Sequence, residues 1–242
     1  MSVPPLSITN PSNFRDLAEN VRSVPLRPYR LFRSDHLGAL DSHDAQQIRA
    51  LGIRRVLDFR GVHERTSAEC SVPGVQVHSL AIEPTIVQVL ARLTEAGQRL
   101  GESEVIHHMQ DTYRGFVRAS AARFGEFFAL LLASPEPTVF HCTAGKDRTG
   151  FAAALVLHAL GATPDEVMRD YLLTNQRLKP PTFVWKGLEP HVAQVLWGVR
   201  PEFLQAALDA VEADWGSVDA FLDRALGVGP AQRDRLLALY AG

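Results

Sequence analysis

The segment PTVFHCTAGKDRTGFAAALVLHALG, residues 137–161, limits the fold of this chain more narrowly than any other stretch. Its first residues, 137–142, form a short apolar run, and residues 150–161 are apolar on nearly every side of a helix. This pattern predicts a buried strand, then a tight loop, then a buried helix. We therefore expect an α/β protein in which this loop joins the last strand to an interior helix.

Apolar runs and amphipathic stretches alternate along most of the chain before this segment and directly after it. Thr163 and Glu166 have the spacing of a capping box, which predicts the start of one more helix. The alternation predicts a mostly parallel central sheet flanked by helices. Strands are expected within 31–37, 53–60 and 75–82, and helices over 41–52, from 83 through 134, and over 164–178.

The length of 242 residues suits a single domain. We expect 1–242 to fold as one unit with three parts. These are an irregular lead-in over 1–30, an α/β catalytic core over 31–178, and a helical extension over 179–242 that packs on the core. Within the extension, the pattern of 179–199 fits either a mobile cover or a packed connector.

The composition is that of a globular protein, with 46% hydrophobic and 21% charged residues and a formal net charge of −2. This charge gives no indication of a nucleic-acid partner. The chain starts without the pattern of a signal peptide, and no apolar run has the length of a membrane helix. Its two cysteines, Cys70 and Cys142, form neither a disulfide framework nor a zinc spacing. A cytoplasmic protein is expected, and secretion without a signal peptide stays open.

Cys142 and Arg148 are separated by five residues. A tight loop that leads into a helix offers backbone N–H groups and the positive end of the helix dipole to a phosphate dianion. Gly145 allows a turn that a side chain would obstruct, and the Arg148 guanidinium has the shape to grip two phosphate oxygens. A nucleotide-binding loop is excluded, because Asp147 stands after Lys146. The residues expected to bind phosphate are Thr143, Ala144, Gly145, Lys146, Asp147 and Arg148.

Cys142 lies at the base of this electropositive loop. Helix N-termini and nearby cations favour the thiolate, which is the nucleophilic form of cysteine. Cys142 is therefore expected to attack phosphorus and to form a phosphocysteine intermediate. From their adjacency to Cys142, His141 is expected to orient the loop and Thr149 to hydrogen-bond the thiolate. The competing interpretation, a buried structural cysteine, is disfavoured because three charged residues in succession are costly in a core.

The stretch HCTAGKDRTG, residues 141–150, resembles the signature loop of the bacterial tyrosine/serine phosphatases, a family of cysteine-dependent enzymes. Other stretches are similar to further blocks of that family, so the resemblance covers most of the chain. It implies a cysteine-phosphatase α/β fold, no metal or other cofactor, and substrates among phosphotyrosine, phosphoserine or phosphothreonine, and phosphoinositides. The further stretches are NFRDL (13–17), LFRSDHL (31–37), VLDFRGVHER (56–65), DYLLTN (170–175) and WGSVDAFL (215–222).

The leaving oxygen needs a proton donor, and three aspartates are candidates. Asp147 lies in the loop itself, and the resembling family has an aspartate at the same place. Asp58 ends a predicted strand, where the sites of α/β proteins gather, and serves either as the acid or as the partner of Lys146. Asp111 matches the upstream offset of the acid in many cysteine phosphatases, but it falls within a predicted helix. We rank Asp147 first, Asp58 second and Asp111 third, with a solvated helix face as the alternative for Asp111.

Charged residues near the Asp58 strand and in the loop extend the candidate site. Arg60 and Arg65 are expected to line the pocket and Glu64 to pair with one of them, with surface ion pairs as the alternative. Lys146 is expected to add positive charge at the pocket mouth, with a solvent-facing lysine as its alternative. In related loops such a lysine accompanies phosphoinositide as well as phosphoprotein substrates. The expected partners are therefore a phosphate ion in the loop and a phosphorylated protein, peptide or phosphoinositide.

Other features favour structural explanations. His107 and His108 are adjacent on a helix and point in different directions, so we expect no metal there. Cys70 is either a redox partner of Cys142 or a buried spectator. An apolar stripe forms either core packing or a lid over the site, and consists of Ile86, Val87, Leu90 and Leu93.

Two other functions compete with the phosphatase interpretation. A rhodanese-like sulfurtransferase or an arsenate reductase also uses a cysteine in an anion-binding loop, but the Arg148-Thr149-Gly150 ending argues against both. A non-catalytic phosphate-binding module is expected to have lost the cysteine, the arginine or the acid. This sequence retains all three, which favours catalysis.

Overall fold

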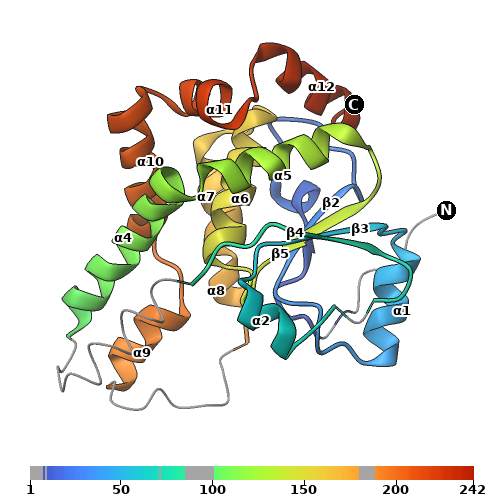
Figure 1. Ribbon diagram of the computed structural model, residues 1–242, viewed down its shortest axis with the longest axis horizontal. Helices are drawn as coiled ribbons and strands as arrows, with labels where there is room; N and C mark the ends of the chain where they lie inside the picture. Colours follow the sequence, from blue (N-terminus) through green and yellow to red (C-terminus); the bar gives the residue numbers. More distant parts are fainter. Residues whose placement is uncertain (1–7, 9, 71, 85–100, 180–188) are drawn as a thin grey trace.

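The computed structural model describes residues 8, 10–70, 72–84, 101–179 and 189–242. These residues contain a five-stranded sheet in the order β1-β2-β5-β3-β4 (Figure 1). β1 is antiparallel to β2, and all other neighbouring strands are parallel, so the predicted mostly parallel sheet is confirmed. The strands are β1 (Arg15–Asp16), β2 (Leu31–Ser34), β3 (Arg55–Asp58), β4 (Gln76–Ser79) and β5 (Thr138–His141).

Helices cover both faces of this sheet (Figure 1). They are η1 (Leu17–Asn20, a 3-10 helix), α1 (Ser42–Ala50), α2 (Val62–Ser67), α4 (Glu102–Ala119), α5 (Ala121–Ala133), α6 (Asp147–Ala159), α7 (Pro164–Leu172), α8 (Thr174–Arg177), α9 (Pro190–Trp197), α10 (Pro201–Trp215), α11 (Val218–Leu226) and α12 (Pro230–Tyr240). None of these described helices is both long enough and apolar enough to cross a membrane.

Side chains of β5 alternate between the two faces, as the period of two in a strand requires. Val139 packs with Val56 and with Ile48 of α1 in the smaller hydrophobic cluster. Phe140 packs with Leu57 in the larger cluster, which also contains the apolar residues of α5 and α6. β5 is therefore buried on both faces, and its C-terminal end opens directly into the Cys142 loop.

α6 is the buried helix that the sequence predicts. Every residue from Arg148 to Leu157 is buried, and Phe151 stacks on Phe116 of α4 and meets Phe124 of α5 edge to face. Such a ring contributes strongly to stability, since Phe-to-Ala changes in cores cost ~3–5 kcal/mol. Burial of this helix on all sides fixes the position of its N-terminus, which faces the loop.

The C-terminal helices pack on the rest of the molecule. Figure 1 shows α10 beside α4 and α11 near α5, and both helix pairs are in contact. Phe203 and Phe221 are fully buried and belong to the same cluster as Phe140 of the central strand. The end of the chain returns to the lead-in, where Gly242 N–H donates to Pro25 O at 2.9 Å.

The lead-in and the helix after Thr163 differ from the sequence predictions. The lead-in is not wholly irregular, because β1 and η1 lie within it. The capping box of Thr163 and Glu166 is confirmed, but the predicted helix is divided at Leu173 into α7 and α8. Asn175 of α8 pairs through its amide with the backbone of Val199, a long-range contact that no local pattern predicts.

The strands predicted within 31–37, 53–60 and 75–82 and the helix predicted over 41–52 are present, shorter by a few residues. The stretch predicted as helical from 83 through 134 contains two helices, α4 and α5, and its residues 85–100 lie outside the described part. α2 is an addition, because its six residues are too short for a periodic pattern. The stripe of Ile86, Val87, Leu90 and Leu93 lies outside the described residues, and so does 180–188 of the segment 179–199. The described part of that segment contains α9, which packs on α4.

Candidate active site

Cys142 stands between the central strand and the N-terminus of the buried helix. It directly follows β5, it is 2% exposed, and Asp147 is the first residue of α6. The intervening residues form a loop at the carboxyl edge of the sheet, which is where α/β proteins place their sites. A thiol at this point faces the positive end of a helix dipole.

The backbone of the loop is held from behind by two side chains. Asn13 Nδ2 donates to Ala144 O at 3.1 Å and to Gly145 O at 3.0 Å, and Arg33 Nη2 donates to Gly145 O at 2.8 Å. In a planar trans peptide the N–H points opposite to the C=O. The N–H groups of Gly145 and Lys146 therefore point away from Asn13 and Arg33, and are left for an anion.

Gly145 has the backbone conformation and the space that only glycine accepts here. Its φ is +66°, and a Cβ at this position would lie 2.3 Å from Ser34 O. A side chain is therefore excluded both by strain and by contact with β2. The turn predicted for Gly145 is confirmed.

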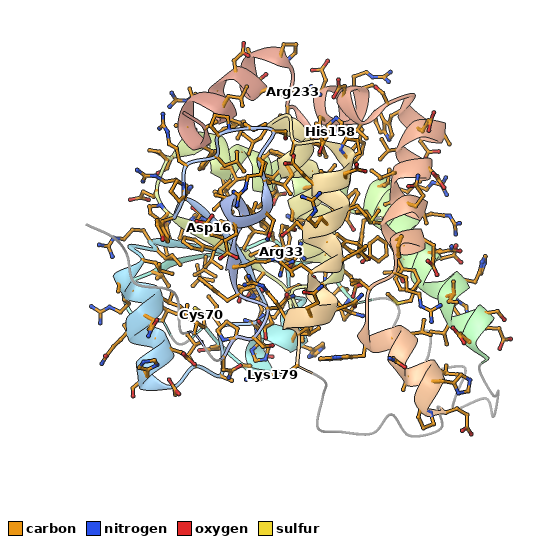
Figure 2. The ribbon with its side chains drawn as sticks, turned by 180° about the vertical axis from the view of Figure 1, so that it is seen from behind. Asp16, Arg33, Cys70, His158, Lys179 and Arg233 are labelled. Carbon is orange, nitrogen blue, oxygen red and sulfur yellow. The ribbon has the colours of Figure 1, made fainter. Side chains whose placement is uncertain are left out.

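A buried ion cluster lies behind the loop, and Figure 2 shows its Arg33 in the interior of the molecule. Asp170 of α7 accepts from Arg15 Nε at 2.9 Å and from Arg33 Nη1 at 2.5 Å. Burial alone raises the pKa of Asp170, but the two arginines lower it to about 2. Asp170 thus neutralises the arginine that holds Gly145 O.

Arg148 uses one edge of its guanidinium for contacts within the protein. Nη1 donates to Glu64 Oε2 at 2.7 Å and to Ile82 O at 2.9 Å, and Nη2 donates to Glu64 Oε1 at 2.9 Å. Nε makes no hydrogen bond with any residue that the structure describes. The edge formed by Nε and the second Nη2 hydrogen is therefore left for phosphate.

Glu64 is the anchor of Arg148, so the expectation that it pairs with Arg60 or Arg65 is wrong. Its carboxylate also accepts from Thr143 Oγ1 and from Gly61 N–H. Burial raises the pKa of Glu64, but the hydrogen bonds and charge of Arg148 outweigh burial and lower it to about 2. Glu64 is therefore ionised whenever the site is functional.

Asp147 is the aspartate at the start of α6, and it is partly exposed. Its Oδ1 accepts a hydrogen bond from Tyr113 of α4 at 3.0 Å, and its Oδ2 lies 3.6 Å from Lys146 Nζ. Tyr113 in turn is hydrogen-bonded to Tyr171 of α7 at 2.6 Å. The carboxyl group is thus fixed on one side and open on the other.

The sequence of this chain is similar to those of known proteins. A family model described as the tyrosine phosphatase family matches residues 6–242. The chain belongs to the tyrosine phosphatase family. A Cupriavidus necator protein, whose name marks it as a candidate tyrosine-protein phosphatase, is 33% identical over 234 residues, 91% of this chain and 84% of that protein.

The triple specificity protein phosphatase PtpB of Mycobacterium tuberculosis is 31% identical over 269 residues, 95% of this chain and 96% of PtpB. Among solved structures, the crystal structure of P. aeruginosa TpbA aligns with 62% of this chain and 73% of its own at 18% identity. Its TM-score of 0.32 is too low to support an argument. The similarity to these two relatives identifies this phosphatase as an enzyme of the tyrosine/serine class.

Asp58, the second-ranked acid of the phosphatase, is 1% exposed and bound by the guanidinium of Arg60 at 2.8 Å. Burial raises the pKa of Asp58, but His141 and Arg60 outweigh it and leave the pKa below its ordinary value. Arg60 is itself 1% exposed and also donates to Ala68 O, so it does not line a pocket as predicted. This arrangement favours a structural ion pair over a proton donor.

His141 and Thr149 flank the loop from within the core. His141 Nδ1 lies 3.0 Å from Cys142 O, a contact of the kind expected for a residue that orients the loop. Burial lowers the pKa of His141 to about 4, so the ring is neutral at physiological pH. Thr149 Oγ1 is buried without a hydrogen-bond partner among the described residues, so the bond predicted to Cys142 is absent here.

Lys146 has a role that the sequence did not suggest. It is 6% exposed, and its Nζ donates to Leu196 O and, at 3.2 Å, to Gly198 O. These carbonyls belong to the C-terminal end of α9, where a cation also complements the helix dipole. The solvent-facing alternative is therefore wrong, and the ammonium group anchors α9 at a point 3.6 Å from Asp147 Oδ2.

The remaining candidates lie in structural positions. Asp111 is exposed on α4, between Arg114 at 2.8 Å and His107 at 3.4 Å, which is the solvated helix face of the alternative interpretation. Cys70 and Cys142 are both free thiols. They pack in clusters on opposite faces of the sheet, so the disulfide considered from the sequence is absent.

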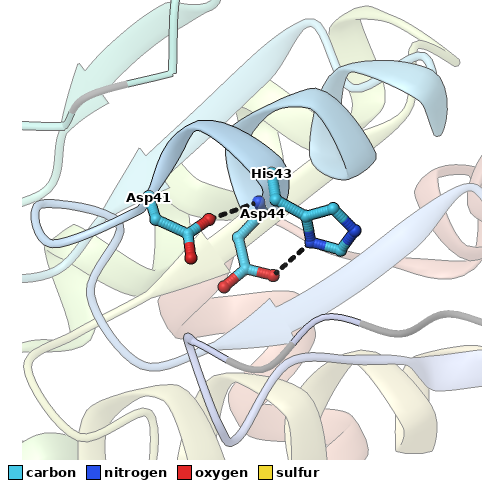
Figure 3. A group of neighbouring side chains, drawn as sticks. All are labelled: Asp41, His43 and Asp44. Atoms are coloured by element: carbon cyan, nitrogen blue, oxygen red, sulfur yellow. Dashed lines mark hydrogen bonds and ion pairs between the residues drawn. The ribbon is translucent and has the colours of Figure 1, made fainter.

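One group of potential metal ligands occurs among the described residues, at the start of α1 (Figure 3). Asp41 Oδ1 caps the helix by accepting from Asp44 N–H at 2.7 Å, and Asp44 Oδ2 accepts from Asn10 N–H at 2.9 Å. His43 is exposed beside Asp44. Helix capping and anchoring of the lead-in explain these carboxylates, and we assign them no role in catalysis.

The sequence reasoning missed most side chains that shape the loop from behind. Asn13, Arg33, Asp170 and Tyr171 were recognised only as parts of the similar blocks, and Tyr113 was not recognised as a site residue. The signal that was available is the set of blocks itself. Stretches 13–17, 31–37 and 170–175 all converge on the carbonyl side of the loop in the structure.

Proposed function

We propose that this phosphatase hydrolyses phosphate monoesters by attack of the Cys142 thiolate on phosphorus. The N–H groups of residues 143–148 and the open edge of Arg148 hold the phosphate oxygens and stabilise the transition state. The observation that best supports the proposal is that Asn13 donates hydrogen bonds to the carbonyl oxygens of Ala144 and Gly145, and so turns them away from the anion site. They leave the neighbouring N–H groups for an anion beside the buried Cys142.

Two displacements complete the reaction. In the first, a bond forms between Cys142 Sγ and phosphorus, the bond from phosphorus to the leaving oxygen breaks, and Asp147 gives its proton to that oxygen. In the second, water attacks the phosphocysteine, Asp147 takes a proton from the water, and the thiolate leaves. Inorganic phosphate is released, and the enzyme returns to its starting state.

Asp147 is the donor that the geometry supports best. It is partly exposed at the rim of the loop, whereas Asp58 is held by Arg60 in the interior. Asp111 makes its contacts with Arg114 and His107 on the exposed face of α4. Of the three candidates, Asp147 is the one next to Arg148, and its Oδ2 accepts no hydrogen bond from any described residue.

The substrates proposed are phosphotyrosine, phosphoserine or phosphothreonine in proteins or peptides, and phosphoinositides. The name of the M. tuberculosis relative, a triple specificity phosphatase, supports testing all three classes. A cytoplasmic location stays a prediction from the sequence. Sulfur transfer and phosphate binding without catalysis have no support in the family match.

The test is phosphate release from a phosphotyrosine peptide, a phosphoserine peptide and a phosphoinositide panel. We expect Cys142→Ser to abolish release, and Cys70→Ser, which changes the other free thiol, to retain it. Transfer of sulfur to cyanide is measured in parallel. Full phosphatase activity of Cys142→Ser, or sulfur transfer without phosphate release by the wild type, would refute the proposal.

A further inference from the structure

Two buried tyrosines form a hydrogen-bonded chain that ends on Asp147. Tyr113 of α4 is 0% exposed and Tyr171 of α7 is 1% exposed. Tyr113 OH lies 3.0 Å from Asp147 Oδ1, and 2.6 Å from Tyr171 OH. A phenol has one proton to donate, so when Tyr113 donates to the carboxylate, Tyr171 must donate to Tyr113.

Both phenols keep their protons at neutral pH. Burial, and after it the charge of Asp147, raises the pKa of Tyr113 and of Tyr171 well above that of a free phenol. Burying two hydroxyl groups is costly unless they are hydrogen-bonded. Within the described part of the molecule, the two hydroxyls bond to each other and to Asp147. Three helices, α4, α6 and α7, therefore meet at this carboxyl group.

The hydrogen bond from Tyr113 makes the two oxygens of Asp147 different. Oδ1 is occupied as an acceptor, whereas Oδ2 accepts no hydrogen bond from any described residue. Oδ2 lies 3.6 Å from Lys146 Nζ, beyond hydrogen-bond distance, and the ammonium group donates two of its three hydrogens to Leu196 O and Gly198 O. A proton on the carboxyl group is therefore placed on Oδ2, the oxygen that is free to face a leaving group.

We propose that Tyr113 and Tyr171 are positioning residues that orient Asp147 and direct its proton through Oδ2 to the leaving oxygen. The inference rests on the proposed function, and adds to it the two residues that make the donor effective. Without Tyr113 OH, the carboxyl group rotates and the proton is shared between two oxygens, only one of which faces the leaving group.

The test uses aryl phosphates whose leaving groups differ in their need for a proton. Dinitrophenolate leaves without protonation, whereas phenolate does not, so kcat/KM for dinitrophenyl phosphate and for phenyl phosphate are compared. We expect Tyr113→Phe to lower kcat/KM for phenyl phosphate about tenfold, the effect of one charge-assisted hydrogen bond, with dinitrophenyl phosphate nearly unaffected. Tyr171→Phe, which leaves Tyr113 OH in place, should show the same selectivity with a smaller loss.

The matched control is Tyr240→Phe, since Tyr240 is another buried tyrosine whose hydroxyl bonds lie in the far part of the core, at Leu131 O and Ser134 O. It should change neither rate. In an Asp147→Asn background, Tyr113→Phe should have no further effect on the phenyl phosphate rate. Thermal unfolding of each variant identifies any that fails to fold, in which case Tyr171→Phe carries the test.

Each other outcome overturns the inference in a distinct way. An equal loss on both substrates, or none on either, removes the positioning role and leaves the phosphatase intact. An Asp147→Asn variant whose loss does not depend on the leaving group shows that Asp147 is not the donor. Activity in Cys142→Ser refutes the proposed function itself, so the two failures are distinguishable.

Discussion

At the scale of single residues, the guanidinium of Arg148 binds the protein through one edge and leaves another edge for the phosphate of the substrate. Glu64 binds the edge formed by Nη1 and Nη2 from 84 residues away, and Ile82 O adds a further contact. Burial lowers the pKa of Arg148, but its hydrogen bonds to Glu64 and the nearby negative charges outweigh burial, so the pKa lies above its ordinary value. The anchored edge fixes the direction of the open one, which reduces the entropy lost when phosphate binds.

Replacing Glu64 with glutamine tests this division. Glu64→Gln keeps the size of the side chain but removes the charge and one of the two acceptor oxygens, so Arg148 is less well oriented. We expect kcat/KM for phosphotyrosine peptide to fall about tenfold, a loss of one charge-assisted bond. Glu69→Gln, an exposed glutamate after α2, is the control and should be neutral. Unchanged kinetics in Glu64→Gln would show that Arg148 needs no anchor.

At the scale of elements, the strand, loop and helix around Cys142 were predictable because they are contiguous in sequence. The apolar residues 137–142, Gly145 and the apolar residues 150–161 each have a local signature, and each has the predicted structure. The supports of the loop come from the lead-in, β2 and α7. Their contacts depend on tertiary packing, which leaves no periodic signal in the chain.

Asn13 gives the most direct test of how these elements shape the loop. Asn13→Ala removes the donor shared by Ala144 O and Gly145 O, and one of these carbonyls then has no side-chain partner. We expect the inhibition constant of inorganic phosphate and the KM for substrate each to rise about tenfold, which is the effect of one lost buried hydrogen bond. The control Asn10→Ala removes an exposed amide bond, to Ala39 O, that does not involve the loop. If both variants bind phosphate equally well, the loop does not depend on Asn13.

The same limits apply to the charged residues of the site. The sequence indicated Cys142, Arg148 and Asp147 as one constellation, because the loop holds all three. It did not indicate that Glu64 pairs with Arg148 or that Lys146 donates to the end of α9. Both contacts join segments that are far apart in the chain. Charge alone permitted several partners, and only packing selected among them.

At the scale of the whole molecule, one continuous core joins the sheet to the C-terminal helices. Phe140 of β5, Phe151 of α6 and Phe203 of α10 belong to a single cluster, so the loop is backed by packing that extends to the end of the chain. Arg15, Arg33 and Asp170 form a cluster of buried charged residues behind the loop. Its three charges link the stability of the fold to pH.

Asp170 predicts the sign of this dependence. Its pKa is about 2 in the folded protein against an ordinary 3.8, so its stabilisation is complete above pH 3.8 and is lost as pH falls through 2. Asp170→Asn should lower the free energy of unfolding by ~3 kcal/mol at pH 7, because two buried arginines lose their partner. Urea unfolding measures this, with the exposed Asp234→Asn as control. A deficit that does not shrink as pH falls from 3.8 toward 2 would contradict the assignment.

The phosphocysteine intermediate is the central claim, and trapping it is the most direct measurement. The enzyme is mixed with a phosphotyrosine peptide carrying radiolabelled phosphate, quenched in acid within milliseconds, digested and mapped by mass spectrometry. We expect label on the peptide that contains Cys142 in the wild type, and none in Cys142→Ser. Release of phosphate by the wild type with no label on Cys142 at any quench time would contradict it.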